Sequence, residues 1–297
     1  MTSKRKRIAI FAAYEKKEFV QDYVIFYLNF LKKVADYIIV VYDNFLPESE
    51  IEKLNNFANY IIAYAHGEYD FGSYKRGYQY AAEKSILNDF DELILCNDSC
   101  FCYKDISPCF KKMEEKNYDF WGMTECEIFS KHLQSWFLVL KKNVFLSNVF
   151  KNFISSVERK DNYIDVVKSY EVALTGILSG QGWKYASVNG HSKYKNPIFY
   201  PVCLYKNRVY FLKKKCFSNY LILKISIADA LKLDRILCKD ENIYNSIRKC
   251  LNISCSIFSF ILKKKVQLFF FEKTIAEHLG TCKIKIFRLQ IWKTKIR

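Results

Sequence analysis

The strongest constraint on the fold is an alternation of short apolar runs and helical segments that continues to about residue 190. Four runs rich in β-branched residues predict buried strands, at 7–12, 37–42, 60–64 and 92–96. Helices are predicted between them at 18–34, from Pro47 onward, and at 74–87. This alternation is typical of an α/β fold, in which helices cover both faces of a mostly parallel sheet.

The segments after residue 100 continue the alternation of strands and helices as far as about residue 190. They predict a helix at 109–116, strands at 119–124 and 134–140, helices at 143–157 and 163–180, and a strand at 183–188. Beyond residue 200, helices are predicted at 221–237 and 242–251, and 255–271 suits either a helix or a strand. We therefore expect an α/β domain at 1–200 and a largely helical segment at 201–297.

Charge divides the chain at the same place. The formal net charge is +16, and residues 201–297 carry +15 of it. A segment of this kind favours an acidic partner, which leaves lipid head groups, nucleic acid or an acidic protein face. A membrane-spanning helix needs about 20 largely apolar residues, and the longest such run in this segment, 253–262, ends at three lysines. We expect a cytoplasmic protein.

The eleven cysteines are scattered and lack the paired spacing of a zinc site, so we expect reduced thiols and no structural metal. Polar residues follow three of the predicted strands, at 43–44, 66–76 and 97–99. Ligands of open α/β sheets bind beyond the carboxyl ends of the strands. The sequence therefore predicts a site for a charged small molecule there.

Asp98 stands out in this predicted site, between Asn97 and Ser99. A carboxylate at a strand end can hold Mg²⁺ or Mn²⁺ against a diphosphate, because these ions prefer oxygen ligands. The alternative is that the three residues only cap a turn or a helix.

The segment 69–77 combines Gly72 and Ser73 at a predicted helix start with Lys75 and Arg76 one turn later. Free N–H groups at a helix N-terminus favour an anion. The alternative is a glycine turn followed by a basic, solvated helix face.

Two further groups of residues are candidates for a substrate site. Aromatic rings beside hydrogen-bonding groups suit sugar recognition, and 121–127 and 132–136 combine the two. Glu171 lies in a partly apolar helix, where a carboxylate can serve as a general base. For the first group, the alternative is that the aromatic residues belong to the core and that His132 has its hydrogen bonds made within the protein. For Glu171, the alternative is a glutamate on the helix surface.

Five motifs in this order resemble the rhamnan synthesis F (RgpF-like) family of bacterial polysaccharide glycosyltransferases. They are YDFGSYK (69–75), LCNDS (95–99), DFWGMT (119–124), HLQSWF (132–137) and YEVxLT (170–175). The resemblance covers about residues 5–200. It implies a GT-A-like, Rossmann-type nucleotide-sugar domain, with dTDP-L-rhamnose as the leading donor and a growing, often lipid-linked glycan as acceptor.

The resemblance also implies roles for single residues. Asn97-Asp98-Ser99 takes the place of the Asp-x-Asp element but keeps one carboxylate, so either Asp98 holds Mg²⁺ or Mn²⁺, or Lys75 and Arg76 replace the metal. Glu171 would deprotonate the acceptor hydroxyl, with Glu125 and Glu127 as rival bases. The residues implied to bind the nucleotide-sugar are Asp43, Tyr69, Asp70, Gly72, Lys75, Arg76, Asn97 and Asp98. Those implied to orient the acceptor are Trp121, Thr124, His132, Gln134 and Ser135.

A lipid-linked acceptor gives the basic segment a role. Polybasic segments bind anionic membranes, so we expect peripheral attachment to the inner face of the cell membrane. The alternative is a helical appendage with a solvated basic face. Two other functions stay open, a nucleic-acid-binding α/β protein and a non-catalytic assembly subunit, although a charge confined to one end disfavours nucleic acid.

Overall fold

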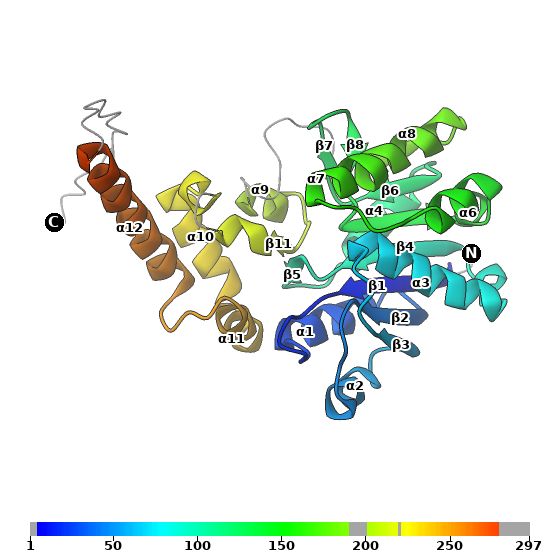
Figure 1. The fold of residues 1–297 in the computed structure, drawn as a ribbon, viewed down its shortest axis with the longest axis horizontal. Helices are drawn as coiled ribbons and strands as arrows, with labels where there is room; N and C mark the ends of the chain where they lie inside the picture. Colours follow the sequence, from blue (N-terminus) through cyan, green and yellow to red (C-terminus); the bar gives the residue numbers. More distant parts are fainter. Residues whose placement is uncertain (1–4, 190–200, 219–220, 279–297) are drawn as a thin grey trace.

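The computed structural model describes residues 5–189, 201–218 and 221–278. A seven-stranded sheet lies at its centre, in the order β10-β6-β9-β4-β1-β2-β3 (Figure 1). The strands are β1 (Arg7–Ala13), β2 (Tyr37–Tyr42), β3 (Tyr60–Ala63), β4 (Glu92–Asn97), β6 (Phe120–Gly122), β9 (Phe137–Lys141) and β10 (Tyr185–Ser187). β9 runs antiparallel to β4 and β6, and the other pairs are parallel, so the predicted mostly parallel α/β sheet is confirmed.

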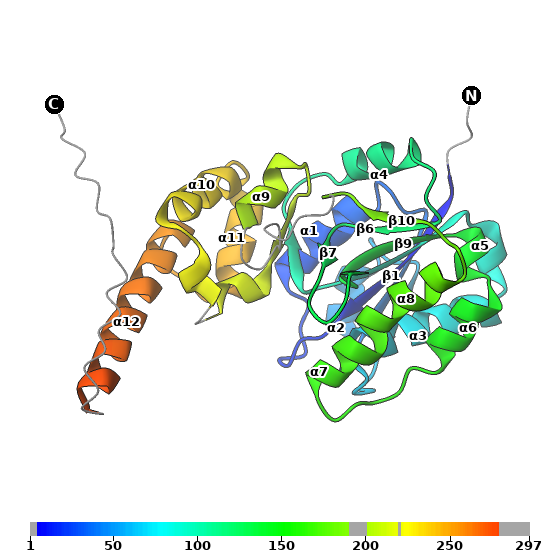
Figure 2. The same ribbon diagram turned by 90° about the horizontal axis from the view of Figure 1, so that it is seen from above.

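Alternate residues of the central strands face two separate cores. On β1, Ile10 belongs to one apolar cluster and Phe11 to the other. Helices α1 (Asp22–Leu31) and α4 (Ser107–Glu114) cover one face, and α3 (Tyr69–Glu83), α6 (Asn148–Ser155) and α8 (Ala173–Gly180) cover the other (Figures 1 and 2). Gly77 allows α3 to pack on β1, because a Cβ atom there would lie 2.5 Å from Ile10 Cγ2.

The predicted helices are present, with shifted bounds. The second helix is α2 (Glu48–Leu54), and the segment 143–157 forms α5 (Lys142–Phe145) and α6. The segment 163–180 is α7 (Tyr163–Val166), a π-helical turn (Val167–Val172) and α8. The prediction for α3 was wrong at its start, because the helix begins at Tyr69 and not at residue 74. Gly72 indicated a loop, but it lies inside the helix.

The segment after residue 200 forms a short helix and one strand of a separate two-stranded sheet before its three longer helices. Its elements are α9 (Pro201–Lys206), β11 (Phe211–Lys213), two 3₁₀ turns (Lys214–Phe217 and Leu221–Lys224), α10 (Ile227–Leu237), α11 (Glu241–Cys250) and α12 (Ile257–His278). β11 pairs with β5 (Cys100–Cys102), which directly follows the end of β4. α11 contacts α1, and α12 resolves the open prediction for 255–271 as a helix. The boundary predicted at residue 200 lies outside the described residues.

Across the parts of the chain that the structure describes, the helices all fall short of the length and apolar character that crossing a membrane requires.

Candidate functional site

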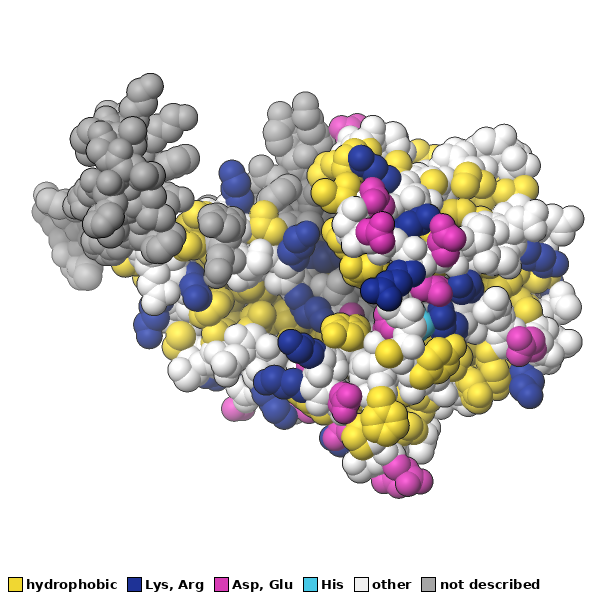
Figure 3. Space-filling model, viewed as in Figure 1, with side chains coloured by type: hydrophobic (Ala, Val, Ile, Leu, Met, Phe, Trp, Pro, Cys, Tyr) yellow, Lys and Arg dark blue, Asp and Glu magenta, His cyan; other side chains and the backbone are white. Residues whose placement is uncertain are grey.

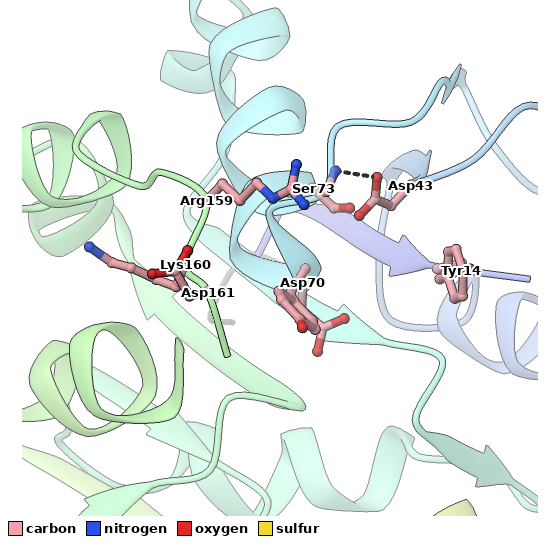
Figure 4. A pocket seen from close by; sticks show the side chains of 10 residues that line it. Tyr14, Asp43, Asp70, Ser73, Arg159, Lys160 and Asp161 are labelled. Atoms are coloured by element: carbon pink, nitrogen blue, oxygen red, sulfur yellow. Dashed lines mark hydrogen bonds between the residues drawn. The ribbon is translucent and has the colours of Figure 1, made fainter. Parts of the chain in front are cut away.

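A cavity of about 410 Å³ opens at the carboxyl ends of β1, β2 and β3 (Figure 4). Asp43 and Asp70 lie on one side of it, and the loop between α6 and α7 supplies Arg159 on the other. The lining residues are Ala13, Tyr14, Asp43, Gly67, Tyr69, Asp70, Ser73, Arg159, Lys160 and Asp161. The structure thus brings three of the predicted nucleotide-sugar residues, Asp43, Tyr69 and Asp70, to one cavity.

Asp43 holds the loop that follows β3. One of its oxygens, Oδ1, accepts hydrogen bonds from the backbone N–H groups of His66 (2.6 Å) and Gly67 (2.8 Å). His66 Nε2 lies 3.0 Å from Ser73 Oγ, so the loop also binds α3. Burial, together with Arg76 and Lys75, lowers the pKa of His66 to about 4 despite the opposing charge of Asp43. His66 is therefore neutral at pH 7, and its contacts with Asp43 and Ser73 hold the loop that brings Gly67 to the cavity.

Asp70 lies in the first turn of α3, where the helix dipole favours a negative charge. Its Oδ2 accepts a hydrogen bond of 2.6 Å from Asn97 Nδ2 at the end of β4. Burial raises the pKa of Asp70 to about 7, and the charges of Asp98 and Glu171 add to this rise. Asp70 is thus a carboxyl group that titrates near neutral pH, and it lies close to two other carboxylates.

Gly72, Lys75 and Arg76 do not line the cavity. Lys75 Nζ and Arg76 Nη1 lie 2.7 and 2.9 Å from Glu68 Oε2, so one carboxylate pairs with both cations. A Cβ atom on Gly72 would lie 2.3 Å from Glu68 Cβ and 2.9 Å from the His66 ring. The absence of a side chain at Gly72 therefore leaves room for Glu68 and His66, in the loop that precedes α3.

Asp98 is engaged by two groups that the sequence did not associate with it. Tyr23 Oη donates to Asp98 Oδ2 (3.0 Å), and Lys214 Nζ lies 3.0 Å from the same oxygen. The neighbouring Lys213 donates through Nζ to Ser99 Oγ (2.8 Å). Both lysines belong to the basic segment 201–297, for which the sequence predicted an acidic partner and no part in this site.

The residues around Asp98 do not fit a divalent metal. An ammonium group already occupies Asp98 Oδ2, and Asn97 is engaged with Asp70 and Ser99. Within 5–189, 201–218 and 221–278, no group of three or more His, Cys, Asp or Glu side chains is arranged to hold a metal ion.

Glu171 lies in the π-helical turn and is the acceptor of a buried network. Its Oε2 accepts from Ser135 N (2.9 Å) and Ser135 Oγ (2.5 Å), and its Oε1 lies 3.4 Å from His132 Nε2. Burial favours a higher pKa for Glu171, but the bonds from His132 and Ser135 outweigh it and lower the pKa. Glu171 and the Ser130 carbonyl in turn raise the pKa of His132 against its burial. Single π-helical turns are frequent at functional sites.

The other predicted acceptor residues lie beneath this network. Thr124 Oγ1 donates to Gln134 Oε1 (2.8 Å) and accepts from Trp136 Nε1 (3.0 Å). Trp121 is 4% exposed and packs against Phe110 in the core, so its ring presents no surface to a sugar. Trp121 is the middle residue of β6, and its burial agrees with the alternative that the aromatic residues belong to the core.

The rival base Glu125 lies on a separate hairpin formed by β7 (Glu125–Cys126) and β8 (His132–Leu133). Its Oε2 is 3.5 Å from Lys131 Nζ.

The fold is that of an α/β protein with a charged cavity at the strand ends. The chain belongs to the rhamnan synthesis protein F family, whose model matches residues 38–285. The match extends beyond the residues that carry the five motifs and includes α9–α12.

Curated relatives include the virulence protein VirA of Vibrio anguillarum, 28% identical over 185 residues, or 60% of this chain and 58% of that protein. The chain thus spans a little over half the length of the curated relatives it matches. Similar solved structures include a cytidylyltransferase from Leptospira borgpetersenii (11% identity, 80% of this chain and 96% of that one, TM-score 0.44). Another is the glycosyltransferase GlyE of Streptococcus pneumoniae (12% identity, 69% and 50%, TM-score 0.42). Similarity at this level carries no argument about activity.

Proposed function

We propose that this protein is a glycosyltransferase that moves a sugar from a nucleotide-diphosphate donor to a growing cell-surface polysaccharide. The observation that carries the proposal is the cavity at the ends of β1–β3, with Asp43 and Asp70 in its wall and Glu171 near by. Membership of the rhamnan synthesis protein F family supports it. The family's name also favours a rhamnose donor, of which dTDP-L-rhamnose is the first to test.

In this proposal the nucleotide occupies the cavity. The exposed rings of Tyr14 and Tyr69 at its rim offer aromatic faces to a base. Asp43 keeps Oδ2 for the ribose or the base, because the hydrogen bonds from His66 and Gly67 both reach Oδ1. Arg159 adds positive charge at the opposite wall, where an anionic ligand enters, whereas Lys160 Nζ is paired with Glu158 Oε1 (2.7 Å).

The reaction we propose is a direct displacement with inversion. The acceptor oxygen forms a bond to the anomeric carbon while the bond from that carbon to the diphosphate oxygen breaks. Glu171 takes the proton of the acceptor hydroxyl. Its pKa is lowered, so it is ionised at neutral pH and able to accept a proton. Glu171 suits this role better than Glu125, because Ser135 and His132 fix its orientation.

We further propose that the C-terminal helices bind the inner face of the cell membrane. Ile227 and Leu231 are exposed one turn apart on α10, and Leu262 and Val266 are exposed one turn apart on the neighbouring α12. In Figure 3, Lys and Arg side chains gather in the middle of the visible face, between these helices and the sheet. Apolar residues beside lysines suit the interface of an anionic membrane.

The test is transfer from radiolabelled dTDP-L-rhamnose, UDP-glucose and GDP-mannose to lipid-linked glycan in bacterial membranes, with binding of dTDP, UDP and GDP measured by titration calorimetry. We expect one diphosphate to bind and its sugar to be transferred. Binding without transfer would favour the non-catalytic assembly subunit. If all three diphosphates fail to bind, the proposal is wrong.

A further inference from the structure

The segment after residue 200 places two lysines beside the end of β4. Lys213 on β11 pairs with Cys100 of β5, and the backbone N–H of Lys214 donates to Ser99 O (3.0 Å). Because β5 directly follows Asp98 and Ser99, this pairing fixes the register of both lysines against the strand end. Backbone hydrogen bonds, and not flexible side chains alone, set their positions.

Their ammonium groups are held at defined points. Lys214 Nζ contacts both Asp98 Oδ2 (3.0 Å) and Tyr23 Oη (2.7 Å), and its side chain is 30% exposed. Lys213 Nζ donates to Ser99 Oγ and lies 5.4 Å from the centre of the Trp136 ring. Since Lys213 lowers the pKa values of Asp70 and Glu171, its charge lies near both the cavity and the proposed base. Neither lysine lines the cavity, but both ammonium groups lie at the carboxyl end of β4, beside Ser99 and Asp98.

Glycosyl transfer requires positive charge at this point. Negative charge develops on the leaving diphosphate, and a fixed cation stabilises it. Asn97 and Ser99 are neutral, and Lys75 and Arg76 are paired with Glu68. Asp98, with one oxygen bound to Lys214, is poorly placed to ligate a metal.

We propose that Lys213 and Lys214 bind the donor diphosphate in place of a divalent metal ion, and that Asp98 positions Lys214. This inference rests on the proposed glycosyltransferase function and adds the cations that neutralise its leaving group. Lys213 and Lys214 touch the diphosphate, and Asp98 acts through Lys214.

The experiment measures binding of dTDP, UDP and GDP to the full chain by titration calorimetry, once with EDTA and once with Mn²⁺. Thymidine, uridine and guanosine serve as probes without phosphate. We expect the preferred diphosphate to bind with a Kd that differs by less than about twofold between the two conditions. The variants Lys213→Met and Lys214→Met should each weaken diphosphate binding by about tenfold and leave nucleoside binding unchanged.

Three variants distinguish diphosphate binding by the two lysines, and the positioning of Lys214 by Asp98, from a loss of structure. Lys249→Met removes the same charge from an exposed ion pair with Asp22, and it should leave diphosphate binding unchanged. Lys214→Arg keeps the charge and should restore most of the binding that Lys214→Met loses. Asp98→Asn should weaken binding far less than Lys214→Met, whereas the loss of a metal ligand would abolish Mn²⁺-dependent binding. If Lys214→Met does not fold, as judged by circular dichroism, Lys213→Met and Lys214→Arg still provide the test.

The outcomes separate this inference from the proposed function. A diphosphate that binds only with Mn²⁺, or an Asp98→Asn variant as defective as Lys214→Met, overturns the inference and leaves the glycosyltransferase standing. If no diphosphate binds in either condition, the proposed function fails and the inference fails with it.

Discussion

Single carboxylates of this protein differ in the groups that surround them. Asp70 lies close to Asp98 and Glu171, and burial adds to the cost of its charge. Glu171 is also buried, but two hydrogen bonds from Ser135 and the His132 Nε2 atom at 3.4 Å favour its charged form. One carboxyl group, that of Asp70, therefore titrates near neutral pH, whereas that of Glu171 is ionised there, and each has a measurable consequence.

The first consequence concerns catalysis by Glu171. We expect Glu171→Gln to lower kcat by about 10²- to 10⁴-fold, the range of general base catalysis, because an amide cannot accept the proton. The KM for the donor and the melting temperature should change little, since Gln can still accept the hydrogen bonds from Ser135. Glu125→Gln is the matched control and should keep most of the rate. Equal losses in the two variants would contradict the role of Glu171.

The second consequence concerns pH and Asp70. Its pKa in the folded protein, about 7, is above the value of an unfolded chain, so the protonated form stabilises the fold. That contribution is complete below about pH 4 and is lost as the pH rises through 7. We expect Asp70→Asn, which cannot ionise, to raise the melting temperature relative to the wild type more at pH 8.5 than at pH 5. A difference that is independent of pH would refute this.

At the scale of elements, β11 links the C-terminal helices to the strand ends. Phe211 is fully buried, and its ring packs against Tyr27, Trp136 and Phe137. Its neighbour Lys213 depends on the same strand for its position. A short three-residue strand thus joins a core contact to the proposed diphosphate site.

We expect Phe211→Ala to lower the free energy of unfolding by about 3–5 kcal/mol, because it removes a large buried ring and leaves a cavity. Binding of the preferred diphosphate should weaken as well, since Lys213 loses its support. Urea denaturation measures the first effect and calorimetry the second. Leu231→Ala, on the exposed side of α10, should change the free energy of unfolding by less than about 0.5 kcal/mol. A similar, small effect of both substitutions would show that β11 does not stabilise the core.

At the scale of the whole molecule, the net charge is distributed unevenly between residues 1–200 and residues 201–297. Residues 201–297 carry nearly all the net charge, and the helices α10 and α12 present apolar residues beside lysines. In Figures 1 and 2 these helices lie to one side of the sheet, with α12 farthest from it and α9 and α11 in between. Attachment through the helices would place the cavity near the membrane surface.

We expect the full chain to co-sediment with vesicles that contain phosphatidylserine and not with vesicles of phosphatidylcholine alone. Replacing the exposed Lys232 and Lys263 by Gln should weaken this binding by about 1 kcal/mol per lysine. Changing Lys111 and Lys116, near the end of α4, to Gln alters the net charge equally and should have little effect. Equal binding to both kinds of vesicle would disprove an electrostatic attachment.

The local pattern of the sequence determined the α/β class, the strands β1, β2 and β4, and the residues that end them, because burial of a strand or helix requires an apolar periodicity within a few neighbouring residues. It therefore located Asp43 and Asp98 at the strand ends, and Asp70 in the segment that follows β3. The start of α3 escaped this reasoning, because glycine usually indicates a turn, whereas Gly72 lies inside the helix and leaves room for Glu68 and the His66 ring. Only the tertiary structure decided which charges meet. Lys214 lies 116 residues from Asp98, and Lys75 is paired with Glu68, since such contacts depend on how β11 pairs with β5 and how α3 begins.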